Sequence, residues 1–147
     1  MSYANKTSVP VERSMIQVRQ ILQKHKVQAV AIAETDEGAA TKFVFEGKPY
    51  QFVIKYPMIS QESVMFTPSG KQRTGAQKLA EIESEKRRLW RCMVLYIKAA
   101  IEAHVNGLVD LKRSMIGHML LPSGKTFYNE IEKNIETFEA NPRFMLE

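Results

Sequence analysis

The feature that most constrains the fold is one long stretch, residues 71–105, in which apolar side chains recur at helical spacing. The stripe consists of Leu79, Ile82, Leu89, Trp90, Met93, Ile97, Ala100 and His104. This spacing predicts a single long helix that turns one face inward, with Trp90 in the core and His104 as a hydrogen-bonded core histidine. The tetrapeptide at 68–71, Pro-Ser-Gly-Lys, predicts a turn before the helix, and Asn106-Gly107 predicts its end.

The other faces of this predicted helix are strongly basic. Residues 71–91 hold seven basic side chains against three glutamates, a net charge of +4, while the whole chain has a net charge of +5. Guanidinium groups match the geometry of phosphates, and Arg87 and Arg91 lie one helical turn apart. We therefore expect one solvent-facing flank that binds a polyanion; the simpler interpretation is a solvated face balanced by its glutamates. The expected contact residues are Lys71, Arg73, Lys78, Arg87, Arg88 and Arg91.

The segments before this helix predict a first helix and a small antiparallel sheet. The first helix is expected over residues 9–25, with Pro10 in its first turn, where the missing N–H breaks no hydrogen bond. Strands are expected over 27–33, 41–46 and 50–56, joined by tight turns.

Two of these strands alternate aromatic and polar residues. The aromatic row consists of Phe43, Phe45, Tyr50 and Phe52, and the opposite side carries Lys42, Glu46, Gln51 and Lys55. Such a row can stack bases, but a sheet covered by helices normally turns it inward. We therefore assign the aromatic row to the core and the lysine-bearing side to solvent.

The rest of the chain predicts two shorter helices, over 108–120 and 126–140, and a short edge strand at 64–66. The expected fold is α+β: an N-terminal helix, a three-stranded antiparallel meander, a long basic helix and two further C-terminal helices. One domain is expected over 9–147, after a flexible arm at 1–8.

Composition limits the class of protein. The single cysteine, Cys92, excludes an internal disulfide framework and a cysteine-based zinc site, and it suits a reducing compartment. No apolar run approaches the roughly 20 residues that span a bilayer, and the polar start has no signal-peptide core. We therefore expect a cytoplasmic protein with no membrane contact.

Three patterns resemble catalytic or cofactor sites without meeting their requirements. Gly124-Lys125-Thr126 is similar to the end of a phosphate loop, but Met119 stands where that loop needs glycine. Asp36, Glu46 and Lys48 resemble the acidic set of a restriction-like nuclease, but the last two fall in a tight turn. The histidines lie on different predicted helices without ligand spacing. We expect no catalytic residues, no cofactor and no metal, and we do not expect an enzyme.

The predicted order of elements has two topological likenesses. Helix, three strands and long helix is the order of the double-stranded RNA-binding domain, in which a basic second helix touches phosphates. This chain lacks the basic helix-start signature of that domain and has only Ala-Gln-Lys, at 76–78, in its place. Without its first helix, the order also resembles the core of the single-strand annealing proteins of phage recombination.

Several short motifs occur along the chain in a fixed order. They are Val9-Pro10-Val11-Glu12-Arg13-Ser14, Thr67-Pro68-Ser69-Gly70-Lys71, Arg88-Leu89-Trp90-Arg91, Val94-Leu95-Tyr96-Ile97-Lys98-Ala99 and Leu121-Pro122-Ser123-Gly124-Lys125-Thr126. In this order and spacing they resemble a family of short proteins encoded in phage, prophage and mobile-element genomes. The resemblance spans residues 9–146 and implies a context, with no activity or site residue attached.

These observations favour a non-enzymatic nucleic-acid-binding accessory protein of phage type, including single-strand binding or annealing, with DNA favoured over RNA. A homo-oligomer would compensate for the small footprint of one chain. Two alternatives stay open: a protein-interaction module that inhibits a host defence enzyme, and a metal-dependent restriction-like nuclease.

Overall fold

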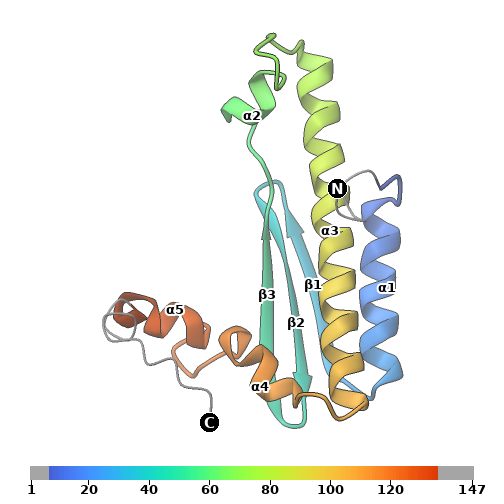
Figure 1. Cartoon of the computed structure of the whole chain (residues 1–147), viewed down its shortest axis with the longest axis vertical. Coiled ribbons are helices and arrows are strands. Elements are labelled where there is room, and N and C mark those ends of the chain that lie inside the picture. Colours follow the sequence, from blue (N-terminus) through green and yellow to red (C-terminus); the bar gives the residue numbers. More distant parts are fainter. Residues whose placement is uncertain (1–6, 136–147) are drawn as a thin grey trace, which may run out of the picture.

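A three-stranded antiparallel sheet and two long helices on one of its faces form the body of the fold, as Figure 1 shows. The computed structural model describes residues 7–135, so residues 1–6 of the expected arm lie outside it. In chain order the elements are α1 (Val11–Lys24), β1 (Gln28–Thr35), β2 (Gly38–Phe45), β3 (Lys48–Lys55), α2 (Glu62–Met65), α3 (Gly75–Val105), α4 (Leu111–Met115), the 3-10 turn η1 (Ile116–His118), α5 (Phe127–Ile131) and the 3-10 turn η2 (Glu132–Asn134). The predicted α+β fold is confirmed.

Two-residue turns join the strands and set the register of the sheet. Glu46 and Gly47 have φ angles of 49° and 76°, which is the turn geometry that matches the twist of paired strands. At the other turn, a Cβ on Gly38 would lie 2.2 Å from the carbonyl oxygen of Ile54, so this close approach requires glycine. The predicted three-stranded meander is confirmed, with slightly shifted strand ends.

The face of the sheet toward α1 and α3 holds the aromatic core. Phe43, Tyr50 and Phe52 are buried, and the ring of Phe43 stacks at 5.5 Å from that of Tyr50 and 5.8 Å from that of Phe52. Trp90 of α3 is completely buried in the same cluster. Trp90 and three of the four aromatic residues therefore lie in the core as predicted, while Phe45 is partly buried against it.

The predicted long helix forms as one element of 31 residues, but Leu79 of its expected inward stripe is 60% exposed. It begins with a capping box, in which the Thr74 hydroxyl accepts from the Gln77 N–H at 3.2 Å and the Gln77 side chain accepts from the Thr74 N–H at 2.9 Å. The C-terminal part of α3 packs against α1 and the sheet. Its N-terminal part extends past the end of the sheet, beside α2 and the loop that follows α2 (Figure 1). The start of the basic stretch is therefore presented at one end of the molecule.

The outer edge of β1 is irregular and partly occupied by α1. Pairing with β2 is interrupted near the start of β1, where Ala29 has a φ of 52°. The guanidinium of Arg19 on α1 donates to the carbonyl oxygen of Val30 at 3.3 Å. A backbone acceptor in this strand is thus paired by a side chain.

The helix expected over 108–120 is shorter in the structure, because its last residues pair with the outer edge of β3. After α4 and η1 the chain leaves helical geometry, so that Met119 pairs with Tyr50 and the Leu120 N–H donates to the Pro49 carbonyl at 2.9 Å. This backbone pairing with β3 replaces the last two residues of the expected helix, and residues 108–110 before α4 are not helical. The helix expected over 126–140 begins as α5 and continues into η2, and residues 136–140 lie outside the described range.

The expected edge strand at 64–66 is wrong, because most of this segment is helical. Residues 62–65 form the short helix α2, whose Val64 side chain is buried. Extended pairing is limited to one bridge between Phe66 and Gln72. The alternation of apolar residues was too short to separate a strand from one helical turn.

Candidate nucleic-acid interface

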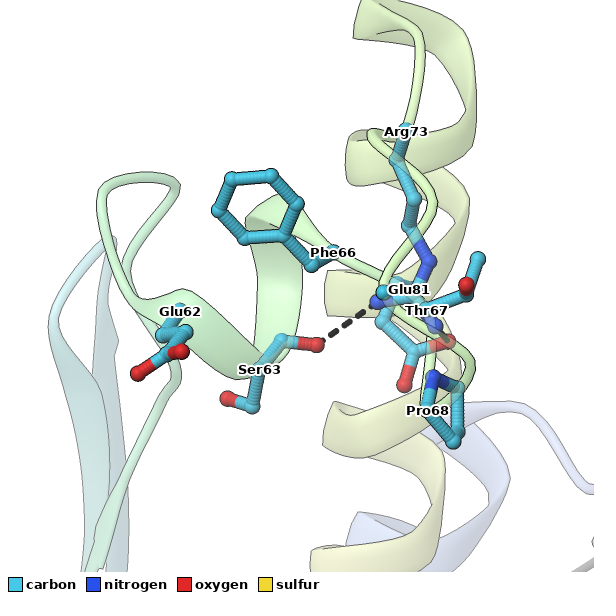
Figure 2. A pocket seen from close by; sticks show the side chains of 8 residues that line it. Glu62, Ser63, Phe66, Thr67, Pro68, Arg73 and Glu81 are labelled. Atoms are coloured by element: carbon cyan, nitrogen blue, oxygen red, sulfur yellow. Dashed lines mark hydrogen bonds and ion pairs between the residues drawn. The ribbon is translucent and has the colours of Figure 1, made fainter.

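Arg73, one of the six expected contact residues, is used inside the protein. Its guanidinium donates to the carbonyl oxygens of Ser63 at 2.6 Å and Val64 at 3.3 Å, and it lies 3.6 Å from a carboxylate oxygen of Glu81 (Figure 2). Its side chain is only 13% exposed. The carbonyls belong to the short helix α2, where they have no partner within the helix. Arg73 therefore fastens α2 to α3.

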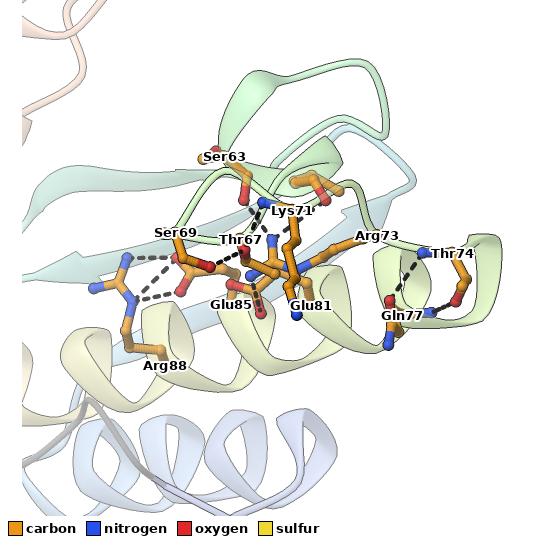
Figure 3. Close-up of polar contacts among 11 residues, drawn as sticks. Ser63, Thr67, Ser69, Lys71, Arg73, Thr74, Gln77, Glu81, Glu85 and Arg88 are labelled. Atoms are coloured by element: carbon orange, nitrogen blue, oxygen red, sulfur yellow. Dashed lines mark hydrogen bonds and ion pairs between the residues drawn. The ribbon is translucent and has the colours of Figure 1, made fainter.

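The loop that carries Lys71 is a small, hydrogen-bonded hairpin. The Thr67 N–H donates to the Lys71 carbonyl at 2.8 Å, and the Lys71 N–H donates to the Thr67 hydroxyl at 3.1 Å. The Gly70 N–H donates to the Thr67 carbonyl at 2.9 Å. Figure 3 shows Thr67 and Lys71 close together beside α3. An open hollow of about 800 Å³ separates this loop from α2. The backbone of the loop is held in place, while Lys71 is exposed.

The glutamates of the basic stretch are each close to one basic side chain. Glu81 faces Arg73 at 3.6 Å, and Glu83 faces Lys86 at 3.3 Å. Glu85 accepts from the guanidinium of Arg88 at 2.8 Å, and this hydrogen bond raises the pKa of Arg88 (Figure 3). Among the described residues, no ion pair within 4 Å involves Lys71, Lys78 or Arg87.

The remaining basic residues of α3 do not form the single flank that the sequence predicts. Lys78 and Arg87 are nine residues apart, about two and a half turns, so they point to opposite sides of the helix. Arg87 lines a hollow of about 260 Å³ with Glu12 of α1, and Arg91 donates to the side-chain oxygen of Gln17 at 2.7 Å. The structure therefore separates a lysine group at the loop from an arginine group along the seam between α1 and α3.

Arg87 has one unusual feature within this seam. Its Nε is buried and has no hydrogen-bond partner among the described residues. A buried guanidinium N–H without an acceptor is costly, so an acceptor from outside the chain would stabilise it. Glu12 and Glu83 also line the hollow, so an incoming anion there would meet negative charge as well.

The face of the sheet away from α1 and α3 is a candidate binding surface, although the sequence analysis assigned it only to solvent. Strand pairing directs twelve residues to it: Gln28, Ala31, Ala33, Thr35, Gly38, Ala40, Lys42, Val44, Pro49, Gln51, Val53 and Lys55. We call this set the open sheet face. It contains two exposed lysines and no carboxylate. The sequence interpretation placed Glu46 on this side, whereas the structure has Glu46 in the hairpin turn.

A pocket of about 300 Å³ adjoins the open sheet face where α5 approaches β3. It is lined by Gln51, Val53, Gly117, His118, Thr126, Tyr128 and Asn129, and we call it the β3–α5 pocket. The His118 ring lies against the Phe52 ring at 4.1 Å between ring centres, with the two planes tilted by 30°, and its Nε2 lies 3.1 Å from the Tyr96 hydroxyl. Burial lowers the pKa of His118, against a smaller opposing effect of a backbone hydrogen bond with Gln51. The imidazole is therefore a fixed, neutral wall at pH 7.

The patterns that resemble catalytic sites have structural explanations. The Thr126 hydroxyl accepts from the Asn129 N–H at 3.3 Å and so caps α5, as expected for a look-alike of a phosphate loop. The Nδ1 atom of His104 accepts from the Leu111 N–H at 3.1 Å, so the predicted hydrogen bond is present. The predicted core position is not, because the His104 side chain is 26% exposed. Within residues 7–135, no three His, Cys, Asp or Glu side chains come together as metal ligands would.

Comparisons with known proteins were made at three levels. No protein-family model, no curated protein and no solved structure matches this chain. In the described part of the chain, no helix combines the length and the apolar character that crossing a bilayer requires. The site must therefore be interpreted from its own geometry.

Proposed function

We propose that the chain is a non-enzymatic nucleic-acid-binding protein, an accessory protein of phage type. The observation that supports this proposal is the charge balance of residues 71–91. The three glutamates of this stretch lie 2.8 to 3.6 Å from three of the basic side chains, and the stretch keeps a net charge of +4. Basic surface in excess of nearby carboxylates favours a polyanionic partner.

In this proposal the lysine group makes the first phosphate contacts. Lys71 is exposed on a loop whose backbone is fixed by hydrogen bonds, and Lys78 follows in the first turn of α3. Since neither lysine makes an ion pair among the described residues, a phosphate would not have to displace a carboxylate. Arg73 and Arg88 are assigned to holding the structure, because their guanidinium groups already have acceptors.

The experiment compares two variants with the same change in net charge. One is Lys71→Glu/Lys78→Glu, and its control is Lys112→Glu/Arg113→Glu, which reverses two exposed cations on α4. Binding to short single-stranded and double-stranded oligonucleotides is measured by fluorescence anisotropy at about 150 mM salt. We expect the first variant to lose about tenfold or more in affinity and the control to lose much less.

Two results would contradict the proposal. One is that the unmodified protein binds no oligonucleotide under these conditions. The other is that both variants lose the same affinity, because the charge of the chain would then matter without a localised site.

A second candidate function is a protein-interaction module. Three large apolar side chains near the loop end of the molecule are more than half exposed: Met58 at 60%, Ile59 at 53% and Leu79 at 60%. Exposed apolar groups of this size beside charges are typical of protein interfaces. Co-purification of a stoichiometric protein without nucleic-acid absorbance would favour this candidate, and Leu79→Asp should then abolish the co-purification.

A further inference from the structure

The walls of the β3–α5 pocket offer both ring faces and hydrogen-bonding edges. Tyr128 is 50% exposed and Val53 is 57% exposed, so the fold leaves two large apolar side chains open beside the pocket. The side-chain amides of Gln51 and Asn129 each supply a donor and an acceptor. A flat ligand with an apolar face and a polar edge would use all four groups.

One side of the pocket is fixed in position by the core. The His118 ring lies against Phe52, and Tyr96 approaches both rings edge-on, at 5.7 Å between ring centres in each case. Because these contacts hold His118, this side of the pocket does not need to be ordered on binding. A preformed site of this kind loses less conformational entropy when a ligand enters.

The surface next to the pocket can neutralise phosphates. Lys42 lies directly opposite Gln51 in the pairing of β2 with β3, and Lys55 lies four residues further along β3 on the same face. Four residues of a strand span about 13 Å. Both lysines are exposed, and the twelve residues of the open sheet face include no carboxylate. One carboxylate lies nearby, because Glu37 of the turn between β1 and β2 lines the hollow at the Lys55 end of this face. A charged backbone that passes along this face therefore meets cations on both sides of Val53.

We propose that the β3–α5 pocket binds one nucleobase of a single-stranded nucleic acid, stacked on Tyr128, with the neighbouring phosphates over Lys42 and Lys55. The inference rests on the proposed nucleic-acid binding and specifies the form of nucleic acid that is bound. A base in a duplex has its faces covered by neighbours and its edge paired, so only an unpaired base can enter such a pocket.

The experiment compares three probes of equal length with the full-length protein: a mixed-sequence single-stranded DNA, an abasic deoxyribose-phosphate strand and a duplex. The unmodified protein is expected to bind the single strand about tenfold more tightly than the abasic strand, since stacking on an aromatic side chain contributes this much per base. Tyr128→Ala should remove this preference and leave the affinity for the abasic strand unchanged. Phe66→Ala truncates an aromatic side chain at the end of α2, which lies at the opposite end of the molecule from α5 (Figure 1), and should keep this preference.

A second variant, Gly117→Ala, tests the pocket without removing a side chain. An added Cβ at Gly117 would lie 3.7 Å from the Cβ of Tyr128, an ordinary contact, so the melting temperature should not change. The added methyl group makes the pocket narrower, so the preference for the single strand over the abasic strand should fall several-fold.

The possible outcomes separate the two proposals. Equal binding of the single and abasic strands by the unmodified protein would overturn the base pocket alone. A preference that persists in both pocket variants would do the same. Failure to bind any of the three probes would overturn the nucleic-acid function as well.

Discussion

The indole nitrogen of Trp90 donates a hydrogen bond of 2.8 Å to the hydroxyl of Tyr56, a residue that follows β3 directly. The same hydroxyl donates to a carboxylate oxygen of Glu34 on β1. One phenol thus connects α3, β3 and β1 at the end of the sheet from which α3 extends. Burial and the Glu34 hydrogen bond both raise the pKa of Tyr56, so the phenol stays protonated far above neutral pH.

Replacing this phenol tests its structural role. Tyr56→Phe keeps the ring but leaves the Trp90 N–H without its acceptor in a fully buried position. We expect a loss of about 1–3 kcal/mol in the free energy of unfolding, measured by urea denaturation. Trp90 is the single tryptophan of the chain, so its fluorescence should change in the folded state as well. Tyr128→Phe, at a half-exposed ring, is the control and should leave both quantities unchanged.

The lowered pKa of His118 predicts how stability depends on pH. Since the folded protein binds the His118 proton less readily than the unfolded chain, the unfolded state holds more protons below the ordinary pKa of 6.5. Stability should therefore fall as the pH drops from 6.5 toward the lowered value, and should level off below it. His118→Phe preserves the stack on Phe52, and its urea denaturation should lack this part of the pH dependence. An unchanged pH dependence in the variant would contradict the assignment.

Removing the guanidinium of Arg73 should loosen one end of the molecule. Arg73→Gln cannot reach the two α2 carbonyls in the same way, so we expect faster hydrogen exchange and faster proteolysis in residues 57–74. Lys71→Gln, an exposed neighbour in the same loop, should not have this effect. If the lysine group makes the phosphate contacts, Arg73→Gln should also weaken oligonucleotide binding less than Lys71→Gln does.

Thr41 offers a prediction about the core. Its hydroxyl is buried and has no hydrogen-bond partner among the described residues, and the residue pairs with Phe52 across the sheet. Thr41→Val has nearly the same shape and removes the unpaired group, so we expect stability to be unchanged or raised by about 1 kcal/mol. The control Thr35→Val should slightly lower stability, because the Thr35 hydroxyl accepts from the Glu37 N–H at 3.2 Å.

The salt dependence of binding counts the phosphate contacts. Each contact contributes about 0.7 to 0.9 to the slope of log affinity against log salt concentration. Lys71→Gln and Lys78→Gln should each reduce this slope by about one contact, and the double variant by about two. Fluorescence anisotropy over a range of salt concentrations measures the slope, and unchanged slopes would remove these lysines from the interface.

Much of the fold could be predicted because its signals are local. The helical spacing around Trp90 and the alternation of Phe43 and Phe45 each report on neighbouring residues, and both were sufficient to place α3 and the hairpin. The turn at Glu46 and Gly47 likewise follows from a dipeptide that tolerates positive φ.

The partners of the basic side chains could not be predicted in the same way. Arg91 meets Gln17, which is 74 residues away in the sequence, and such a pairing depends on how α1 packs on α3. Arg73 meets carbonyls of a helix that the sequence patterns assigned to a strand. The alternation of residues along the strands predicted which side chains lie on the open sheet face. It also placed Glu46 there, whereas the structure has Glu46 in the turn and so leaves the face without a carboxylate.

The two occupied edges of the sheet have a consequence for assembly. With Arg19 on the backbone of β1 and Leu120 on the backbone of β3, an incoming strand would have to break existing bonds before it could join. Growth of a continuous sheet from one molecule to the next is therefore disfavoured near the start of β1 and the start of β3, which acts against ordered aggregation at these two positions.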